Sequence, residues 1–437
     1  MKLPAAISGV VLLLSALASV FAQDSVLEKL QDEIRTLAAR AAPAIVKVTA
    51  ERTLPERAFP ESMRDIPGLD LESLLSRASS VATGFLMDRS GLILTTHRIG
   101  DAADRIRVDF PGGIVREGRL VGYDNYFQVG VVRVDPPEGI EPLVLRDEEA
   151  LPVGSLGVFV GNSFGGSANL TLAIVSGSGK QALPGAGAYD NFLVLNAPIM
   201  PGDAGGPFLD PEGRVLGMAV GSHGGGIQLV GSGGAGSIRF RNLPDISGRG
   251  LAIPSADLKF AVEQIRVHGR VPASWMGLSV KPGTVEVGEV VPDSPAAAAG
   301  IRIGDVLQTL SGKPVTNSRQ LLFRLLRAPI GVPAPVTFLR GEEGMECECI
   351  FEDALKALEE ALPGVKVDPA MGIRISMATG AAAEAGLTEG DVILAVNGMR
   401  VTSVAGVLRA LRGGAEKKIV ILVGRDRGVV NIELVRQ

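Results

Sequence analysis

Residues 299–315 read AGIRIGDVLQTLSGKPV, and residues 385–401 read AGLTEGDVILAVNGMRV. The two stretches lie 86 residues apart, and 7 of their 17 aligned positions are identical. Each is followed by an apolar run with helical spacing, at 318–326 and 403–411. Each is preceded by a short β-type segment that contains glycine, at 275–280 and 371–375. This repeat predicts two copies of one small module in the C-terminal part of the chain, with residues 354–363 as a helix or linker between them.

The chain upstream of the repeat has a different pattern. Short β-type runs alternate with glycine turns, at 84–87, 92–95, 105–110, 129–134, 156–160, 169–176, 192–195 and 215–220. Many short strands without strong helices predict a β-barrel domain. A helix is expected before it at Asp24–Arg40, a short helix near Leu71–Leu75, and a glycine-rich loop at 224–237.

Composition narrows the function classes. The chain has 437 residues, and its 43 Lys and Arg against 48 Asp and Glu give a net charge of −5. This balance argues against a dedicated nucleic-acid binder and against a polybasic membrane-surface protein. Two cysteines rule out a disulfide scaffold, and three histidines leave few combinations for a metal site. We expect no metal or other cofactor.

Both cysteines lie in an alternating stretch. Met345, Cys347, Cys349 and Phe351 are expected on one face of a strand. Next-but-one positions on a strand are poorly spaced for a disulfide, so we expect free thiols.

The N-terminus has the pattern of a secretory signal. Residues 1–22 read MKLPAAISGVVLLLSALASVFA, with Lys2 before an apolar stretch and small residues before a break at Gln23. This pattern predicts cleavage after Ala22 and a secreted or periplasmic protein without a stable membrane span. An uncleaved anchor is the alternative, because the stretch is about long enough to cross a bilayer.

The repeated modules resemble PDZ domains. Residues 294–306, SPAAAAGIRIGDV, are similar to the segment "SPAAxAGLxxGDVI" of that family, and residues 380–392 match it more weakly. The resemblance implies PDZ domains at 270–353 and 362–437. Each would bind an extended peptide or a protein C-terminus as an added strand, with backbone amides of a glycine loop around the terminal carboxylate.

The resemblance also implies where peptide would bind. The loop of the first module would be Met276, Gly277, Leu278 and Ser279, and that of the second Gly372, Ile373 and Arg374. Part of the pocket for the last side chain would come from Leu321, Leu322, Leu325 and Leu326, some of which must face the module core instead. Gly277 would let the carboxylate approach the backbone closely, so Gly277→Val is expected to weaken binding and to leave the fold intact. The alternative is that these segments only close each module.

The upstream domain resembles the trypsin-like protease domain of the HtrA/Deg family. The similar segments are 83–86 with 91–95, 158–165 (VFVGNSFG), 201–207 (PGDAGGP) and 250–254 (GLAIP). Their order and spacing agree with the family. The resemblance implies a mainly β fold with some helix: a trypsin-like double β-barrel at 81–268, with its first strand near 43–50, and then two PDZ domains. Residues 23–80 would form an N-terminal helix and loop.

The catalytic positions depart from that family. Alignment puts Arg98 at the general base, Gln128 at the orienting aspartate and Ala204 at the nucleophile, so no catalytic residue is expected. Alanine has no nucleophilic oxygen, and arginine stays protonated and accepts no proton. The backbone of the oxyanion loop is retained around Gly202 and Asp203. The Asp203 carboxylate would oppose an oxyanion if it pointed inward, and would otherwise be solvated.

Four further residues are candidates for a displaced active site. His97 lies one position before the expected base, Ser163 lies in a turn, and His223 and His268 lie in a glycine-rich loop and at a domain junction. Turn, surface or packing roles are the competing interpretation of each.

These observations predict an HtrA-like pseudoprotease. It would act outside the cytoplasm as a peptide-binding adaptor, regulator or chaperone in protein quality control. The alternative is an active serine endopeptidase with relocated residues, and a third possibility is a barrel that only holds the PDZ pair. The resemblance implies a homotrimer, or a mixed oligomer with an active paralogue, assembled partly through the N-terminal segment.

Overall fold

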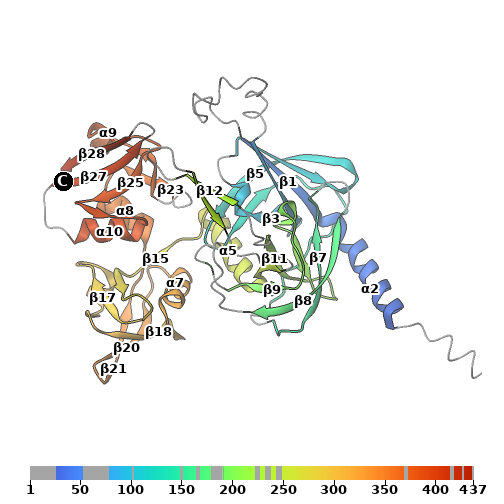
Figure 1. The fold of residues 1–437 in the computed structure, drawn as a ribbon, viewed down its shortest axis with the longest axis horizontal. Coiled ribbons are helices and arrows are strands. Elements are labelled where there is room, and N and C mark those ends of the chain that lie inside the picture. The colour runs from blue at the N-terminus through green and yellow to red at the C-terminus, as the bar shows by residue number, and fades with distance from the viewer. Residues whose placement is uncertain are drawn as a thin grey trace, which may run out of the picture.

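A computed structural model describes most of the chain. The described residues are 26–52, 78–100, 103–147, 151–163, 168–178, 189, 191–221, 227–231, 238–242, 249–368, 373–413, 418–425 and 428–435. The expected signal peptide, the short helix near Leu71–Leu75, His223 and Gly372 lie outside these ranges. Figure 1 shows two barrels on one side of the molecule and two smaller units on the other.

The barrel domain consists of two closed barrels, as predicted. The first has the strand order β1-β2-β3-β6-β5-β4 and the second β10-β11-β14-β9-β8-β7. The strands of the first barrel are β1 Ile45–Arg52, β2 Ala78–Leu86, β3 Leu92–Thr96, β4 Arg105–Phe110, β5 Ile114–Asp124 and β6 Val129–Arg133. Those of the second are β7 Leu156–Gly161, β8 Asn169–Ser178, β9 Leu193–Leu195, β10 Pro207–Leu209, β11 Val215–Gly221 and β14 Gly250–Pro254. The strands predicted from short β-type runs are therefore confirmed.

Two helices flank the barrels. Helix α2, Val26–Ala41, projects from the domain, and only its C-terminal end is buried there (Figure 1). Helix α5, Ser255–His268, packs on β5, β6 and β11. It ends at Gly269, which has a left-handed φ of +73° and donates its N–H to the Ile265 carbonyl. This C-cap turns the chain toward the first small unit.

The expected glycine-rich loop at 224–237 is wrong in part. Residues Ile227–Gly231 form β12, which pairs with β13, Ile238–Asn242. The apolar residues within this segment are enough for a hairpin strand despite the surrounding glycines.

The first module contains the following elements: β15 Ser274–Trp275, β16 Leu278–Val280, β17 Val287–Val290, α6 Pro295–Ala298, β18 Val306–Leu310, β19 Lys313–Pro314, α7 Ser318–Leu326, β20 Ala334–Arg340, β21 Glu343–Cys349 and β22 Glu352–Asp353. Helix α7 has the predicted bounds because Asn317 caps its N-terminus, its Oδ1 accepting the Gln320 N–H at 2.9 Å. Both cysteines are free, and along β21 the residues Met345, Cys347 and Cys349 face inward while their neighbours are exposed. Burial raises the pKa of the Cys349 thiol to about 12.

The second module repeats this plan: α8 Ala354–Ala361, β23 Val365–Asp368, β24 Arg374–Ala378, α9 Gly380–Glu384, β25 Val392–Val396, β26 Met399–Arg400, α10 Val404–Arg412, β27 Lys418–Arg425 and β28 Gly428–Val435. Segment 354–363 is largely helical, and α8 belongs to the hydrophobic core of this module. The core therefore begins eight residues before the expected boundary at Leu362.

The first module is docked on the barrel domain. Arg327, directly after α7, forms an ion pair with Asp257 of α5 at 2.6 Å. Its guanidinium also lies over the rings of Phe260 and Phe323. The second module contacts the first, because Arg412 stacks on Trp275 at 4.7 Å and donates to the Asp293 carbonyl. Within the described residues, no helix is both long and apolar enough to cross a membrane.

Candidate functional site

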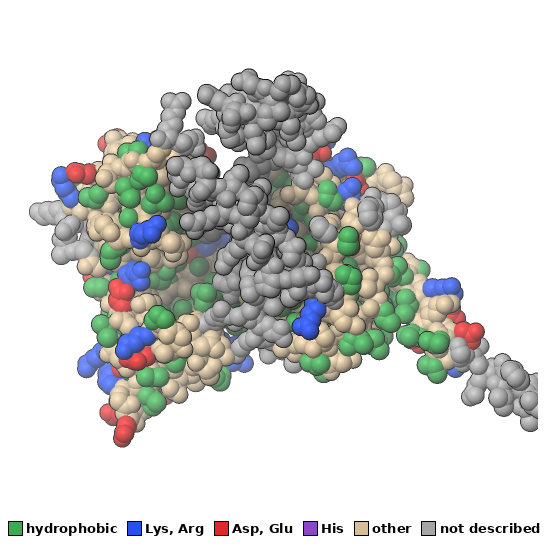
Figure 2. Space-filling view, viewed as in Figure 1, with side chains coloured by type: hydrophobic (Ala, Val, Ile, Leu, Met, Phe, Trp, Pro, Cys, Tyr) green, Lys and Arg blue, Asp and Glu red, His purple; other side chains and the backbone are tan. Residues whose placement is uncertain are grey.

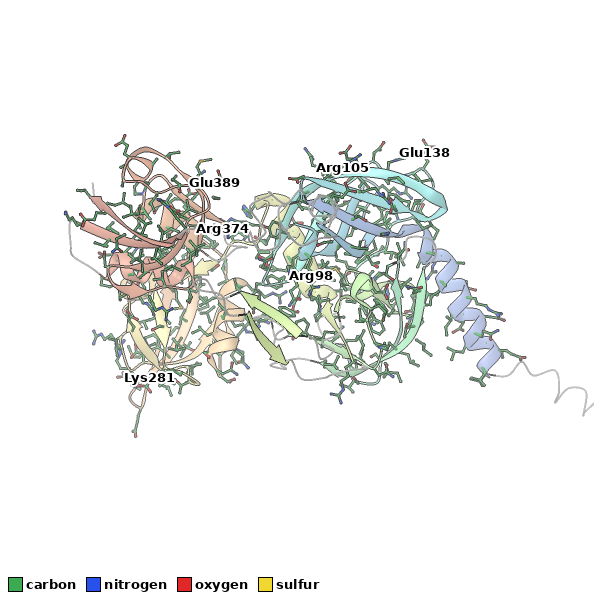
Figure 3. All side chains as sticks on the ribbon, turned by 45° about the horizontal axis from the view of Figure 1, so that its top comes forward. Arg98, Arg105, Glu138, Lys281, Arg374 and Glu389 are labelled. Atoms are coloured by element: carbon green, nitrogen blue, oxygen red, sulfur yellow. The ribbon has the colours of Figure 1, made fainter. Side chains whose placement is uncertain are left out.

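The expected general base position lies where β3 ends. The short 3-10 turn His97–Ile99 follows the strand, and buried Ile99 anchors it to the barrel. Arg98 is exposed, on the side of the barrels that faces the PDZ modules (Figure 3). His97 is half-buried, with its Nδ1 3.4 Å from Thr96 Oγ1. The turn therefore points Arg98, rather than an imidazole, away from the core at this position.

The expected aspartate position lies beside that turn. Gln128 directly precedes β6 and has a left-handed φ of +55°, which is uncommon outside glycine. Its carbonyl accepts the His97 N–H at 3.1 Å. The structure thus brings the positions of the base and of the aspartate together.

The expected nucleophile position follows the 3-10 turn Pro201–Asp203. Ala204 is 3% exposed, and Gly205 follows with a φ of +91°. A Cβ atom at Gly205 would lie 2.0 Å from the Thr83 carbonyl oxygen, so only glycine fits there. The glycine sequence of this turn therefore has a packing reason as well as a catalytic one.

Thr83 of β2 joins this turn to β3, and sequence reasoning did not single it out. Its N–H donates to the Ala204 carbonyl at 2.9 Å, and its hydroxyl donates to the Gly202 carbonyl at 3.0 Å. Its own carbonyl accepts the Thr95 hydroxyl at 2.8 Å, two residues before His97. Arg98, Gln128 and Ala204 therefore gather where the two barrels meet.

Asp203 is neither solvated nor free to turn toward solvent. It is 4% exposed, and its Oδ1 accepts the Ser163 N–H at 3.2 Å. The carboxylate packs against Gly161 at the end of β7, where a Cβ would approach it to 2.3 Å. The expectation of an outward, solvated side chain is wrong because β7 leaves a glycine-lined space for the carboxylate. Asp203 fastens the Gly202 turn to the second barrel.

The remaining candidate groups do not assemble a second active site among the described residues. Ser163 lies in a turn, and its hydroxyl accepts the Asn169 side-chain N–H at 3.3 Å. His268 is exposed at the end of α5. Turn and surface roles describe both residues.

The loop of the first PDZ module is arranged around Gly277, which has a φ of +78°. The Met276 carbonyl accepts the Ala296 N–H at 2.7 Å, and the Gly277 carbonyl accepts the Val291 N–H at 2.8 Å. Because C=O and N–H of a trans peptide point in opposite directions, the N–H groups of Gly277 and Leu278 point away from these partners. They face the side on which the outer edge of β16 has no strand partner among the described residues.

Gly277 is also needed for the loop itself. A Cβ atom there would lie 2.1 Å from the Ser294 Cβ, and the positive φ disfavours any side chain. The expectation that Gly277→Val leaves the fold intact is therefore wrong. The leucines of α7 divide as expected: Leu321 is in the module core, Leu325 and Leu326 are half-buried, and Leu322 is 41% exposed.

The equivalent loop of the second module is not the predicted one. Gly364 has a φ of +84°, and its carbonyl accepts the Thr379 N–H at 2.8 Å, as Gly277 does from Val291. Ile373 directly precedes β24, and Arg374 begins it. Strand β24 pairs with β23 as β17 pairs with β16, so Arg374 lies on the second strand of the pair (Figure 3). The loop equivalent to 276–278 is therefore 363–365, and it is preceded by a helix rather than a strand.

Comparison with known families agrees with this division. Residues 82–218 match the trypsin-like peptidase domain, and residues 265–349 and 376–425 each match a PDZ domain. The chain is 27% identical over 424 residues to the periplasmic pH-dependent serine endoprotease DegQ of Escherichia coli (strain K12). The aligned region covers 90% of this chain and 88% of DegQ. The chain is 26% identical to a probable periplasmic serine endoprotease DegP-like of Chlamydia trachomatis serovar D, over 78% of this chain and 72% of the relative.

The chain is HtrA-like: it has a trypsin-like peptidase domain followed by two PDZ domains, and it is similar along most of its length to DegQ and DegP-like endoproteases.

Solved structures share the fold of this HtrA-like protein. A serine endoprotease from Yersinia pestis is 25% identical, with a TM-score of 0.51, and covers 73% of this chain and 97% of that one. The HtrA-type protease AlgW with tripeptide is 22% identical, with a TM-score of 0.55, over 73% of this chain and 96% of that one. The relatives named above are periplasmic, which supports an extracytoplasmic location for this HtrA-like protein.

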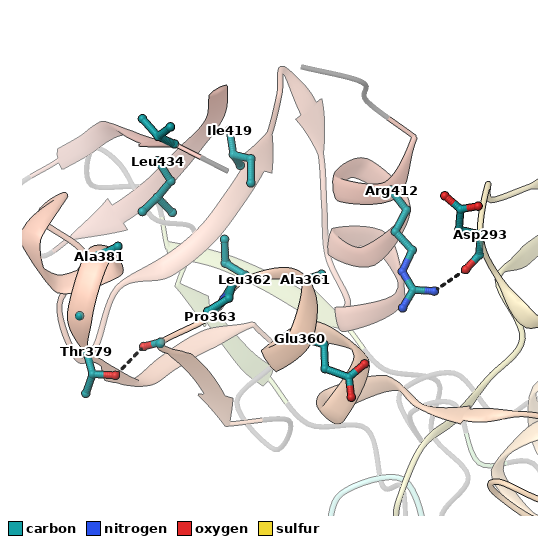
Figure 4. A pocket seen from close by; sticks show the side chains of 13 residues that line it. Asp293, Glu360, Ala361, Leu362, Pro363, Thr379, Ala381, Arg412, Ile419 and Leu434 are labelled. Atoms are coloured by element: carbon teal, nitrogen blue, oxygen red, sulfur yellow. Dashed lines mark hydrogen bonds between the residues drawn. The ribbon is translucent and has the colours of Figure 1, made fainter. Parts of the chain in front are cut away.

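A cavity of about 770 Å³ lies beside the loop of the second PDZ module. Leu362, Pro363 and Ile419 line it, and Arg412 and Asp293 close one side by a hydrogen bond of 2.9 Å (Figure 4). The residues of β23 do not line it. The cavity is thus at the end of the sheet, outside the space between β23 and α10.

The last residue of β5, close to Gln128, has a carboxyl group with a shifted pKa. Burial raises the pKa of Asp124 to about 6, although its carboxylate accepts the Phe127 N–H at 2.7 Å and Arg270 favours the charged form. Because the folded state holds this proton between about pH 4 and 6, stability from this group falls as pH rises through that window.

We therefore expect Asp124→Asn to stabilise the HtrA-like protein near pH 7 by at most about 3 kcal/mol, since asparagine keeps an acceptor for Phe127 and carries no charge. Urea denaturation at pH 4, 5, 6 and 7 measures this, with Asp135→Asn as a control outside β5. The two unfolding curves should converge at pH 4. A gain that is equal at every pH would mean that titration of Asp124 is not its cause.

Proposed function

We propose that this HtrA-like protein is a catalytically inactive pseudoprotease that captures peptides outside the cytoplasm through its PDZ pair. The observation that carries the proposal is the placement of Arg98, Gln128 and Ala204 on linked elements at the barrel junction: the His97 N–H bonds the Gln128 carbonyl, and Thr83 links the Ala204 turn to β3. At the three positions where the family resemblance implies base, aspartate and nucleophile, the chain offers a guanidinium, an amide and a methyl group.

Elementary chemistry supports inactivity. The nucleophile of an acyl transfer must carry a lone pair and lose a proton to a base, and neither step is open to alanine and arginine. An amide at position 128 carries no charge to stabilise an imidazolium. The barrel would then serve as a scaffold that holds the PDZ modules.

A second candidate function is a working serine endopeptidase with relocated residues. The names of the relatives favour it, and His97 lies in contact with Gln128 through its backbone N–H. A serine-reactive fluorophosphonate probe separates the two candidates. Time-dependent labelling of purified protein, lost in His97→Ala, would support the endopeptidase and contradict the pseudoprotease.

Peptide capture by the first module is supported by its loop and its free edge. Backbone N–H groups at Gly277 and Leu278 would hold a terminal carboxylate, and the outer edge of β16 would pair with the peptide. Peptides with a free carboxylate and an apolar last residue would bind, in the micromolar range at about −8 kcal/mol. Amidated versions of the same peptides are the matched control. Equal binding of both forms would contradict the carboxylate loop.

Assembly with further copies, or with an active paralogue, is supported by exposed apolar side chains beside α2. Val26 and Leu27 on that helix are 84% and 76% exposed. Strands β7 and β8 carry further exposed apolar residues: Leu156, Leu170, Leu172 and Ile174. Leu156 and Leu172 line one pocket together with Leu30 and Ile34 of α2, and Figure 2 shows apolar side chains where this helix meets the barrel. Such a surface is typical of a protein–protein interface.

We expect the double variant Leu27→Lys and Leu172→Lys to sediment as a smaller species than the native oligomer, because two buried charges would face each other in the interface. Analytical ultracentrifugation measures this. Val429→Lys, at an exposed position of β28, is the control and should leave assembly unchanged. A native chain that sediments as a monomer would contradict the assembly.

A further inference from the structure

The helices α7 and α10 of the two PDZ modules keep the register of the sequence repeat. Asn317 and Ser403 cap α7 and α10 at the same point of the repeat, 86 residues apart. The contacts around the repeated Gly-Asp also match: Val287 N–H donates to the Asp305 carbonyl and Ile375 N–H to the Asp391 carbonyl, both at 2.7 Å. Leu322 of α7 is therefore equivalent to Leu408 of α10, and Leu325 to Leu411.

These equivalent leucines differ in exposure. Leu322 is 41% exposed and Leu325 is half-buried, so the first module leaves both accessible to solvent. Leu408 is 0% exposed and Leu411 is 1% exposed. Since side chain, helix register and fold are the same, another part of the molecule must cover the leucines of the second module.

Helix α8 is that cover. It begins at the Asp353 cap, whose carboxylate accepts the Leu355 N–H at 3.0 Å, and packs against α10. Ala354, Ala357 and Leu358 are spaced as one helix face, and all are buried in the same core cluster as Leu408 and Leu411. The first module has a strand of two residues, β15, at this point of the repeat, which pairs with β22 and contacts α7 less extensively than α8 contacts α10.

The loop of the second module is also poorer in donors. Val365 stands where the first module has Leu278, and its N–H already donates to the Leu362 carbonyl at 3.2 Å. Beside the loop, Arg412 at the end of α10 is engaged by Asp293, Glu352 and the ring of Trp275. Both features favour a fixed contact within the chain over the capture of a mobile peptide.

We propose that α8 is the resident occupant of the peptide groove of the second PDZ module. The second module takes up no peptide and instead supports the first, which is the one peptide-binding module of the chain. The occupied groove of the second module is a structural claim that holds with or without peptide. The statement that the first module binds peptide rests on the proposed function of peptide capture.

Cysteine accessibility tests the occupied groove without any peptide. Leu322→Cys and Leu408→Cys are made separately in full-length Cys347→Ser protein, and the rate of reaction with a maleimide is measured. We expect Leu408→Cys to react at least about 100-fold more slowly, because α8 must open locally before the thiol is reached. Adding Leu358→Ala should accelerate Leu408→Cys and leave Leu322→Cys unchanged. Equal rates for the two cysteines in folded protein would overturn the proposal.

Peptide stoichiometry tests the same proposal if Leu408→Cys fails to fold. Fluorescent decapeptides with a free carboxylate and a last residue of Val, Leu or Phe are titrated into the full chain. We expect one peptide per chain, and a loss of at least tenfold in affinity for Leu322→Lys. Ala405→Lys, an exposed position of α10, is the matched control and should bind normally. Two peptides per chain, or tight binding that persists in Leu322→Lys, would overturn it. If no peptide binds the native chain, peptide capture fails as the function, and the labelling rates still decide whether α8 fills the groove.

Discussion

The triple variant Arg98→His, Gln128→Asp and Ala204→Ser is expected to cleave unfolded casein, whereas the native chain and Ala204→Ser alone show no cleavage above background. Removing the nucleophile or the base of a Ser-His-Asp triad costs roughly 10⁶ in turnover. A serine added alone has no base, because Arg98 and Gln128 remain. The triple variant restores all three groups of the triad. The turn at position 204 is already held by hydrogen bonds from Thr83 to the carbonyls of Ala204 and Gly202.

Release of fluorescent casein fragments over time measures this expectation. A variant that also carries Thr83→Ala is the matched control, since it keeps the triad and loosens the turn. Turnover by Ala204→Ser alone would show that another group acts as the base, and would contradict the expectation that Arg98 and Gln128 prevent catalysis.

The second large effect is expected at the contact between the barrel domain and the first PDZ module. Arg327→Met should destabilise the protein by about 3 kcal/mol, because it leaves the buried Asp257 carboxylate without its cation. Asp257 is 1% exposed and also accepts the Tyr189 hydroxyl at 2.5 Å and the Asn191 side-chain N–H at 2.9 Å. Those two neutral donors still stabilise the carboxylate when Arg327 is absent. The expected destabilisation is therefore at the low end of the range of about 3–5 kcal/mol for breaking a buried ion pair.

Chemical denaturation followed by circular dichroism measures the loss. Arg89→Met is the control, because the pair of Arg89 with Glu141 is exposed and should contribute at most about 1 kcal/mol. Adding Asp257→Asn to Arg327→Met should recover part of the stability by removing the charge. If Arg327→Met costs no more than Arg89→Met, the buried pair does not hold the module in place.

Tyr189 and Asn191 extend this contact to the second barrel. They precede β9 of the second barrel, while Asp257 lies on α5 and Arg327 follows α7. One carboxylate thus joins a barrel strand, the linking helix and a PDZ module. Burial and the neighbouring carboxylate raise the pKa of Tyr189 well above its usual value, so its hydroxyl stays a donor. No pattern in the sequence could have indicated this set, because its members are up to 138 residues apart and each looks ordinary in its own segment.

Local patterns predicted the elements well where one residue type decides them. The bounds of α7 follow from the Asn317 cap and the apolar spacing after it, and β4 follows from alternation at Arg105–Phe110. Local patterns gave the wrong assignment where the tertiary environment of a segment determines its role. Residues 371–375 looked like the counterpart of 275–280 because both contain glycine and apolar residues, but the positive φ and hydrogen bond of Gly364 identify the true equivalent.

The sequence by itself determined the domain order, the repeat and the identity of the side chains at the three triad positions, since these depend on spacing and residue type along the chain. Only the tertiary structure decided that the elements carrying Arg98, Gln128 and Ala204 are linked at the barrel junction, that Asp203 is buried against Gly161, and that α8 packs in one core with Leu408. The physical reason is the same in each case. Exposure and proximity are properties of packing between distant segments, so two leucines in identical local sequence positions can face solvent in one module and the protein core in the other.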